Sequence, residues 1–340
     1  MRINRINKRK GVVAVLILTV VFLPWLLADA ANEKGLSGKA FTDPSHKVEM
    51  PKEWIEKPVK YEDFAKDADI AIALEQDLYQ AIIHIIQKYA KDNNLKIAVK
   101  EGTCGIAAGM LSRKTIDMGG FCCPAGKEDR LPGLKYHTLG IASKVILIHP
   151  ENPINNLSVK QVKDIFAGKI FKWSELKTDK GEKGPDWTIQ AIGRFHCKNR
   201  PGHWRLILPN ENLFSPRLSE VGSIPDMIAK VTSQKAAIGW EVLGMVEHYR
   251  KMGKVKALKI DGYEPTNADA VASKKYPFYR TYNITTWEGK NVANPHAQKL
   301  VNYLMKEVAK LDPKLGFVPS SSLKKAGWKF KENELTGEPK

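Results

Sequence analysis

Short apolar strands alternate with helices over residues 70–121, and this alternation most constrains the fold. Residues 70–74 and 96–99 have the apolar character of buried strands, and residues 116–118 are a third candidate. Apolar residues recur every three to four positions from Leu78 to Tyr89, which predicts an amphipathic helix with Asp77 as its cap. A strand–helix–strand–helix–strand order predicts a mostly parallel sheet with helices on both faces.

Cysteines follow the predicted strands. The four in the chain are Cys104, Cys122, Cys123 and Cys197. The first three follow the strands at 96–99 and 116–118, and the fourth follows a predicted strand at 188–192. Ligands bind outside the carboxyl ends of the strands in such sheets. We therefore expect these loops to meet at one cleft.

A second α/β unit begins with an apolar strand at 144–149. A helix at 157–166 follows, with Ser158 as its cap, and a strand at 236–240 returns to the first unit. The other expected elements are an interrupted helix at 218–231, strands at 255–260, 282–286 and 316–319, and a long helix at 296–311. We expect crossings at 142–148 and 236–242 to form a hinge that closes around a ligand. The expected organisation is an extended leader (31–66), lobe 1 (67–141 plus 243–330), an inserted lobe 2 (142–242) and a tail (331–340).

The first 30 residues have the pattern of a secretory signal peptide. Residues 1–10 hold five basic residues and no acidic one, residues 11–27 are apolar, and Ala28-Asp-Ala30 fits a cleavage site. The alternative is an uncleaved signal anchor, because the apolar run is almost long enough to span a membrane. The sequence predicts an exported, periplasmic protein.

The formal net charge is +17 over 340 residues. The lysines are scattered and often alternate with acidic residues, which is typical of a solvated surface, although the same field would attract anions. Export, and the lack of a basic run beyond the first segment, argue against nucleic acid as a partner.

Several segments carry a family resemblance. They are NPINNLSVKQVKDIFAGKIFKWSEL (152–176), Ile192–Arg194, Ala237–Trp240, Val255–Gly262 and Gly316–Pro319. In this order and spacing, from about Asp67 to Lys325, the chain resembles the phosphate-binding-type periplasmic proteins of ABC transporters. The resemblance implies an α/β, two-lobed type 2 periplasmic-binding-protein fold. Each lobe would be a mostly parallel sheet flanked by helices.

The ligand loops depart from that family. Its members hold phosphate with Ser and Thr hydroxyls, backbone N–H groups at helix starts and an Arg-x-Asp-Gly-Ser-Gly-Thr loop, because an oxyanion needs many short donors. By position, the resemblance implies ligand contacts from Thr103, Cys104, Gly105, Cys122, Cys123, Arg194, His196, Cys197, Lys198, Asn199 and Arg200. Thiols replace most of the usual hydroxyls, and Glu75 in the first loop would repel an anion.

Three interpretations of the cysteines stay open. Export favours disulfides, with Cys104 joined to Cys122 or Cys123 and Cys197 joined to the other. Alternatively, the four sulfurs, with His196 and His203 as further candidates, would hold zinc, copper(I), a trivalent metalloid or an iron–sulfur cluster. Nearby cations and helix starts would then lower the thiol pKa values. In the third interpretation, Arg194 and Thr103 still hold an oxyanion.

No catalytic motif accompanies these loops: the chain has no Ser-His-Asp order, paired carboxylates, P-loop or dinucleotide loop. We therefore expect a binding protein and not an enzyme. It would deliver a small anion, or a soft metal or metalloid, to a membrane permease or a sensor kinase. The alternative is a thiol-based redox or metal-handling protein on the same scaffold.

Overall fold

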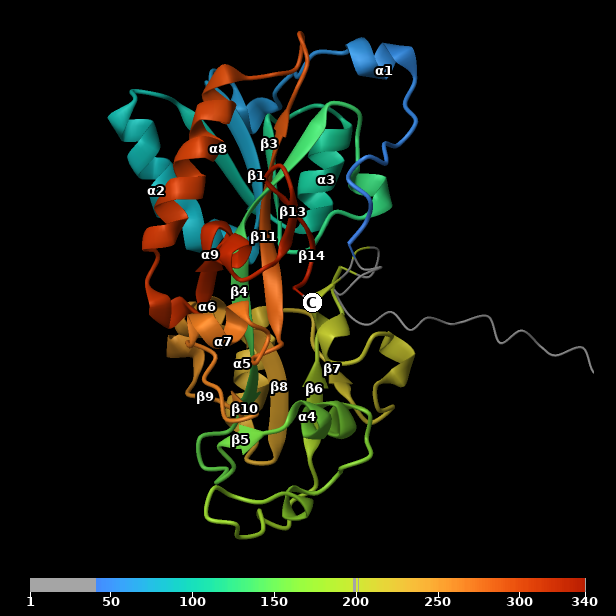
Figure 1. The fold of residues 1–340 in the computed structure, drawn as a ribbon, viewed down its shortest axis with the longest axis vertical. Coiled ribbons are helices and arrows are strands. Elements are labelled where there is room, and N and C mark those ends of the chain that lie inside the picture. Colours follow the sequence, from blue (N-terminus) through green and yellow to red (C-terminus); the bar gives the residue numbers. More distant parts are fainter. Residues whose placement is uncertain (1–40, 198–199, 201, 340) are drawn as a thin grey trace, which may run out of the picture. The chain divides into compact units, whose positions relative to one another are not determined.

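The computed structural model has a mixed α/β fold built around one large sheet (Figure 1). It describes residues 41–197, 200 and 202–339. The strand order is β2-β1-β3-β11-β4-β8-β6-β7, and β9 and β12 also pair with β4. The strands of this sheet are β1 Ile70–Glu75, β2 Ile97–Gly102, β3 Met118–Phe121, β4 Leu134–Ile148, β6 Gln190–Gly193, β7 Ser219–Glu220, β8 Ala237–Val242, β9 Lys256–Ala257, β11 Tyr279–Trp287 and β12 Phe317–Pro319. Two small sheets pair β5 Asn156–Leu157 with β10 Lys259–Ile260 and β13 Lys329–Lys331 with β14 Glu334–Gly337.

Strand β4 joins the two halves of the sheet. Its first part pairs with β11, and its last part, Lys144–Ile148, pairs antiparallel with β8. The prediction that this strand begins at 144 was wrong by ten residues, because polar side chains interrupt its apolar pattern. Those side chains are buried but bonded: Thr138 Oγ1 donates to Asn283 Oδ1 at 2.7 Å, and His137 Nε2 lies 2.8 Å from Thr286 Oγ1.

Helices cover both faces of the first half of the sheet, as predicted. Helix α2 (Gln76–Asp92) packs against α8 (Pro295–Glu307) in one apolar core, and α3 (Cys104–Ser112) contributes to another core on β1 and β3 (Figure 1). The prediction that Asp77 caps α2 was wrong. Glu75 is the cap, and its carboxylate accepts from the Asp77 N–H at 3.1 Å.

In the second half of the sheet, the helices α4 (Val159–Phe166) and α5 (Ile224–Ser233) each bury an apolar face. Ser158 caps α4 as predicted, in a reciprocal arrangement with Gln161. The predicted helix at 218–231 begins later, because residues 219–220 form β7 instead. The remaining short helices are α1 Lys52–Glu56, α6 Leu243–His248, α7 Ala268–Ala272 and α9 Ser320–Lys325. No described helix is long and apolar enough to cross a membrane.

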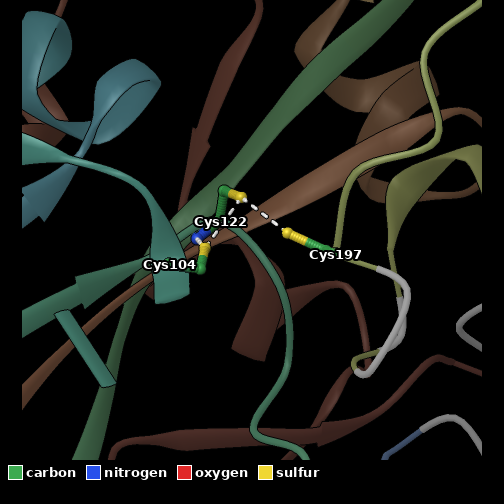
Figure 2. A group of neighbouring side chains, drawn as sticks. All are labelled: Cys104, Cys122 and Cys197. Carbon is green, nitrogen blue, oxygen red and sulfur yellow. Dashed lines mark hydrogen bonds between the residues drawn. The ribbon is translucent and has the colours of Figure 1, made fainter. Parts of the chain in front are cut away.

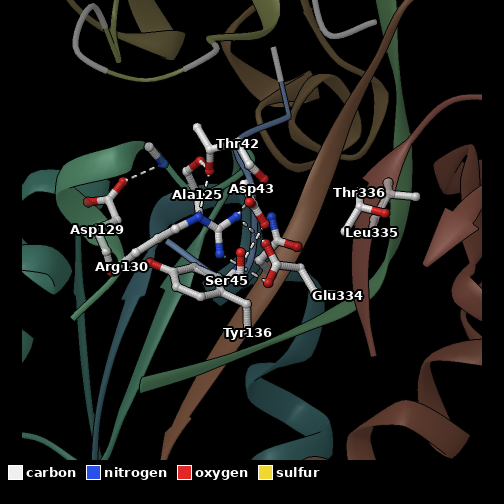
Figure 3. Close-up of polar contacts among 12 residues, drawn as sticks. Thr42, Asp43, Ser45, Ala125, Asp129, Arg130, Tyr136, Glu334, Leu335 and Thr336 are labelled. Carbon is white, nitrogen blue, oxygen red and sulfur yellow. Dashed lines mark hydrogen bonds and ion pairs between the residues drawn. The ribbon is translucent and has the colours of Figure 1, made fainter. Parts of the chain in front are cut away.

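The described part of the leader and the C-terminal tail meet at Arg130 (Figure 3). Arg130 donates to Thr42 Oγ1 at 2.6 Å and forms a buried ion pair with Glu334 of β14 at 2.6 Å. Thr42 in turn donates to the Ala125 carbonyl at 2.8 Å. Both ends of the described chain are therefore tied to the turn between residues 122 and 130, next to the cysteines. The predicted signal peptide at 1–30 lies outside the described residues.

Candidate ligand-binding site

Three sulfurs converge between the two halves of the sheet (Figure 2). The Cys122 Sγ lies 3.3 Å from the Cys104 Sγ and 4.0 Å from the Cys197 Sγ, and all three sulfurs lie within 4.8 Å of one another. Cys123 Sγ lies 3.8 Å from Cys122 Sγ, but it is not part of the group in which every pair lies within 4.8 Å. The structure thus brings together cysteines that are far apart in the sequence.

Each sulfur is placed by the end of a regular element. Thr103 caps α3 by accepting from the Ile106 N–H at 3.2 Å, which fixes Cys104 as the first residue of the helix. Cys122 follows the last residue of β3, and the Cys122 N–H points at the Cys104 sulfur at 3.5 Å. Asn283 of β11 holds this turn by donating to the Cys123 carbonyl at 2.8 Å.

Cys197 lies in the loop after β6 with a φ of 57°. This left-handed conformation is uncommon for a residue with a side chain and costs roughly 1–2 kcal/mol. It is the kind of local strain that the surrounding structure must stabilise, and such strain is concentrated at functional sites. Cys197 is also the half-buried member of the group, whereas the other three cysteines are buried.

All four cysteines are free thiols, so neither of the expected disulfides is present. The thiol pKa values also differ from the expectation that nearby cations lower all of them. Burial raises the pKa of Cys122 well above its usual range, and hydrogen bonding with Cys104 raises that of Cys123. Hydrogen bonds from the other three thiols lower the pKa of Cys197, because they favour its thiolate.

A cavity of about 360 Å³ opens in front of the sulfurs. Cys104 and Cys197 line it, whereas Cys122 lies behind them with 1% of its surface exposed. The other lining residues are Glu75, Gln76, Gly102, Thr103, Gly105, Arg194, His196, Arg200 and Gly222. The cavity therefore lies at the strand ends where the sequence placed the ligand loops.

A carboxylate already neutralises Arg194, which the resemblance assigns to an oxyanion. Arg194 Nη2 and Nε donate to the Glu241 Oε2 at 2.7 and 3.2 Å, and both side chains are buried. Glu241 also accepts from the Val242 N–H at 3.0 Å through Oε1. Burial alone would lower the pKa of Arg194, but the Glu241 charge outweighs it and the pKa is raised.

Arg200 has a carboxylate partner as well. Its guanidinium forms a bidentate ion pair with the Asp129 carboxylate, in which Nε lies 2.7 Å from Oδ2. Asp129 accepts in addition from the Gly126 N–H at 2.9 Å, so it is fixed by the turn that Arg130 anchors (Figure 3). This pair joins the loop after β6 to the turn after β3.

Arg280 of β11 is the third cation, and it is fully buried. It pairs with Asp77, and its Nη2 lies 3.8 Å from the Glu75 Oε1. Burial raises the pKa of Glu75 to about 7. Arg280 also lies 3.2 Å from the Nε2 of His196, and burial lowers the pKa of His196 to about 3, so the ring is neutral.

The predicted site residues thus have different roles. Cys104, Cys122 and Cys197 form the sulfur group, with Cys123 beside it. Thr103 has its hydroxyl oxygen on a helix N–H, and Gly105 lines the cavity. Lys198 and Asn199 lie outside the described residues, as does the side chain of His203.

Sequence reasoning missed the partners of the arginines: Glu241, Asp129, Asp77 and Arg280. A single charge inside an apolar strand is the available signal, since Glu241 follows Ala-Ile-Gly-Trp in β8 and Arg280 interrupts the aromatic start of β11. Such a charge is almost never fully buried without a partner. That signal indicates a buried pair but does not say with which residue.

Comparison with known proteins agrees with this geometry. Residues 65–308 match the model of the PBP superfamily domain, the superfamily of periplasmic binding proteins. The chain belongs to this superfamily. It is 22% identical over 326 residues to the phosphate-binding protein PstS of Bacillus subtilis, covering 93% of this chain and 96% of that protein. This similarity to a phosphate-binding protein agrees with the resemblance seen in the sequence.

Two solved structures have the same fold. An ABC-type phosphate transport receptor from Vibrio cholerae has 20% identity and a TM-score of 0.56, covering 73% of this chain and 99% of its own. A protein described as a phosphate ABC transporter substrate-binding protein from Clostridium perfringens, with bound phosphate, has 18% identity and a TM-score of 0.61, covering 74% and 98%. The predicted α/β fold of the periplasmic binding proteins is confirmed. The strand pairings of β1 and β6 are parallel as predicted, whereas those of β4 and β11 are antiparallel. Membership of the superfamily confirms the prediction of a solute-binding protein, not an enzyme.

Proposed function

We propose that the protein is an exported solute-binding protein whose ligand is a thiophilic ion and not phosphate. It would be directed to the periplasm by residues 1–30. The ion would bind between lobe 1 (67–141 plus 243–330) and lobe 2 (142–242), and the closed form would deliver it to an ABC transporter permease or to a sensor kinase. The names of the relatives support a small-solute role with a transporter.

The sulfur group carries the proposal. Three free thiols from three separate loops lie within 4.8 Å of one another beside a cavity. Soft thiolate ligands select copper(I), zinc and similar ions, whereas oxyanions need hydroxyl and N–H donors. Among the described residues that line the cavity, Thr103 supplies the only hydroxyl group, and its oxygen already accepts from the Ile106 N–H.

The charges near the cavity also argue against phosphate. Each of the described arginines at the site already has a carboxylate partner: Arg194 with Glu241, Arg200 with Asp129, and Arg280 with Asp77. A phosphate dianion would meet guanidinium groups whose positive charge a buried carboxylate already offsets, which weakens their attraction for it. An ion held by sulfur leaves all three pairs in place.

The test begins with protein isolated from the periplasm without metal-affinity resin. Bound elements are measured by mass spectrometry, free thiols by titration after denaturation, and phosphate binding by calorimetry. We expect a thiophilic element in stoichiometric amount, or four reactive thiols that take one up, and no phosphate binding. Absence of free thiols together with tight phosphate binding would refute the proposal. In that case Arg194→Ala should abolish the phosphate binding.

A redox role is the second candidate, and Cys197 favours it. Cys197 is half-buried, its pKa is lowered by three neighbouring thiols, and its sulfur lies 4.0 Å from that of Cys122. An accessible thiolate near a second thiol is the arrangement used in thiol–disulfide exchange. If this role is correct, the protein reduces a disulfide substrate and Cys197→Ser loses that activity. Equal activity in the variant and the parent protein argues against it.

A further inference from the structure

The geometry of the sulfur group narrows the ligand further, on the basis of the function proposed above. We propose that the site takes a trivalent metalloid, arsenic(III) or antimony(III), through the three sulfurs of Cys104, Cys122 and Cys197. The metalloid would enter as its neutral trihydroxide. Cys123 is not one of the ligands.

The spacing of the sulfurs fits one small three-coordinate centre. Three sulfurs bound at about 2.3 Å to one atom lie about 3.4–4.0 Å apart as the bond angle widens from about 95° to 120°, if the zinc–sulfur length is used as a guide. The observed distances from the Cys122 sulfur are 3.3 Å to Cys104 and 4.0 Å to Cys197. Small side-chain rotations are therefore enough to bring the three sulfurs around a common atom.

The number of donors is three. Zinc in structural sites takes four ligands in a tetrahedron. In the described part of the chain, the group of potential ligand atoms within 4.8 Å of one another contains three sulfurs and no nitrogen or oxygen. Of the other candidates nearby, Cys123 has its Sγ 3.8 Å from the Cys122 Sγ but outside this group. His196 has its Nε2 at Arg280, and Thr103 Oγ1 accepts from a helix N–H. A pyramidal metalloid needs three sulfurs and no fourth donor.

The charges around the site favour a neutral ligand. Arg194, Arg200 and Arg280 are each paired with a carboxylate, so among the described lining residues an anion finds no unpaired arginine. Glu75, the remaining carboxylate of the lining, lies 3.8 Å from Arg280. The trihydroxides of arsenic(III) and antimony(III) are uncharged at neutral pH. Such a molecule brings no charge into the cavity and does not disturb the three buried pairs.

The reaction balances without an oxidant or reductant. Three thiols react with one trihydroxide, three metalloid–oxygen bonds break, and three metalloid–sulfur bonds form. Each protonated thiol gives its proton to a departing hydroxyl group, which leaves as water. Where Cys197 reacts as the thiolate, its hydroxyl group leaves as hydroxide and takes a proton from solvent, so three waters are released in all and the metalloid keeps its oxidation state. The product links Cys104 and Cys122 to Cys197, which belongs to the other half of the sheet.

The experiment uses the purified, fully reduced protein, with sodium arsenite and potassium antimonyl tartrate as separate probes. Native mass spectrometry should show one metalloid atom gained and three protons lost. X-ray absorption should show three sulfur neighbours and no oxygen. Both measurements use the parent protein, so they do not depend on whether a variant folds. A mass gain that retains hydroxyl groups, or fewer than three sulfur neighbours, would overturn the proposal.

Single serine variants then identify the ligands. Cys104→Ser, Cys122→Ser and Cys197→Ser should each raise the dissociation constant for arsenite at least 100-fold. Cys123→Ser, a change of the same size in the adjacent residue, should change it less than threefold. Urea unfolding of each variant verifies that it is folded. An equal loss in Cys123→Ser would indicate a four-sulfur site and refute the three-ligand assignment.

Competing probes separate this inference from the function on which it rests. If copper(I) or zinc binds to the thiols and arsenite and antimonite do not, the metalloid assignment fails and the thiophilic-ion function stands. If none of these ions binds and inorganic phosphate does, both fail. Arsenite binding that survives a tenfold excess of zinc supports the metalloid assignment directly.

Discussion

Replacing Glu241 with glutamine removes the carboxylate that neutralises Arg194. The substitution keeps the shape of the side chain, and Oε1 can still accept from the Val242 N–H. An amide NH₂ group replaces Oε2, the atom to which Arg194 donates at 2.7 and 3.2 Å. Two donors then face each other, and the arginine charge is left without a partner in a buried position.

The expected loss of stability follows from burial. The Glu241 side chain is fully buried and that of Arg194 is 9% exposed. Removing one partner of such a pair costs about 3–5 kcal/mol. With a urea m-value of about 3 kcal/mol/M, the unfolding midpoint should fall by about 1–1.7 M. The matched control is Glu56→Gln, because Glu56 pairs with Lys52 on the surface with 63% and 80% of the side chains exposed. It should change the free energy of unfolding by less than about 0.5 kcal/mol.

Phosphate provides the second part of the assay. In Glu241→Gln the unpaired Arg194 lines the cavity, so the variant should gain an anion site that the parent protein lacks. Phosphate at a hundred times its dissociation constant would restore about 2.7 kcal/mol by linkage. Urea unfolding with and without phosphate measures this, with sulfate as a comparison anion. An unfolding midpoint equal to that of the parent, or equal stabilisation of both proteins by phosphate, would refute the argument that the Glu241 carboxylate takes the place of a bound anion at Arg194.

Two further predictions concern the fold. Gly140→Ala should lower the free energy of unfolding in urea by about 3 kcal/mol or more, because its Cβ would lie 2.3 Å from the Val318 carbonyl oxygen in the adjacent strand. The control Gly222→Ala, which has open space around the added Cβ, should leave the free energy of unfolding nearly unchanged. Burial lowers the pKa of His137 to about 4 in the folded protein, below the value of about 6.5 in the unfolded chain. As the pH falls from 6.5 towards 4, the unfolded chain therefore binds a proton that the folded protein does not. The free energy of unfolding should drop by about 3 kcal/mol over that range. In His137→Gln that part of the decline should be absent between pH 7 and 4.5, and an identical decline would contradict the assignment.

Local patterns predicted the elements that local interactions define. The apolar spacing from Leu78 to Tyr89 and the Ser158 cap correspond to α2 and α4 as observed. The prediction was wrong where a polar residue finds a distant partner. Strand β4 was predicted too short because its buried polar residues bond across to β11, and Asp77 pairs with Arg280 in place of capping α2.

The candidate site divides in the same way. The sequence alone placed the four cysteines at strand ends, and the parallel-sheet rule placed those ends at one edge. The distances between the sulfurs depend on details that no local pattern contains. They include the left-handed conformation of Cys197 and the bond from Asn283 to the Cys123 carbonyl.

The sequence by itself determined the α/β class and several of the loops that line the cavity, because periodicity, caps and strand ends depend on neighbouring residues. The periplasmic-binding-protein type followed from the resemblance of its motifs to that family. Only the tertiary structure decided the charge of the site. In the sequence, Arg194 and Arg200 look like the cations of an anion-binding site. The folded structure shows that each forms an ion pair, Arg194 with Glu241 and Arg200 with Asp129. A buried charge must be paired, but the choice of partner is made by strands and turns that are distant in sequence.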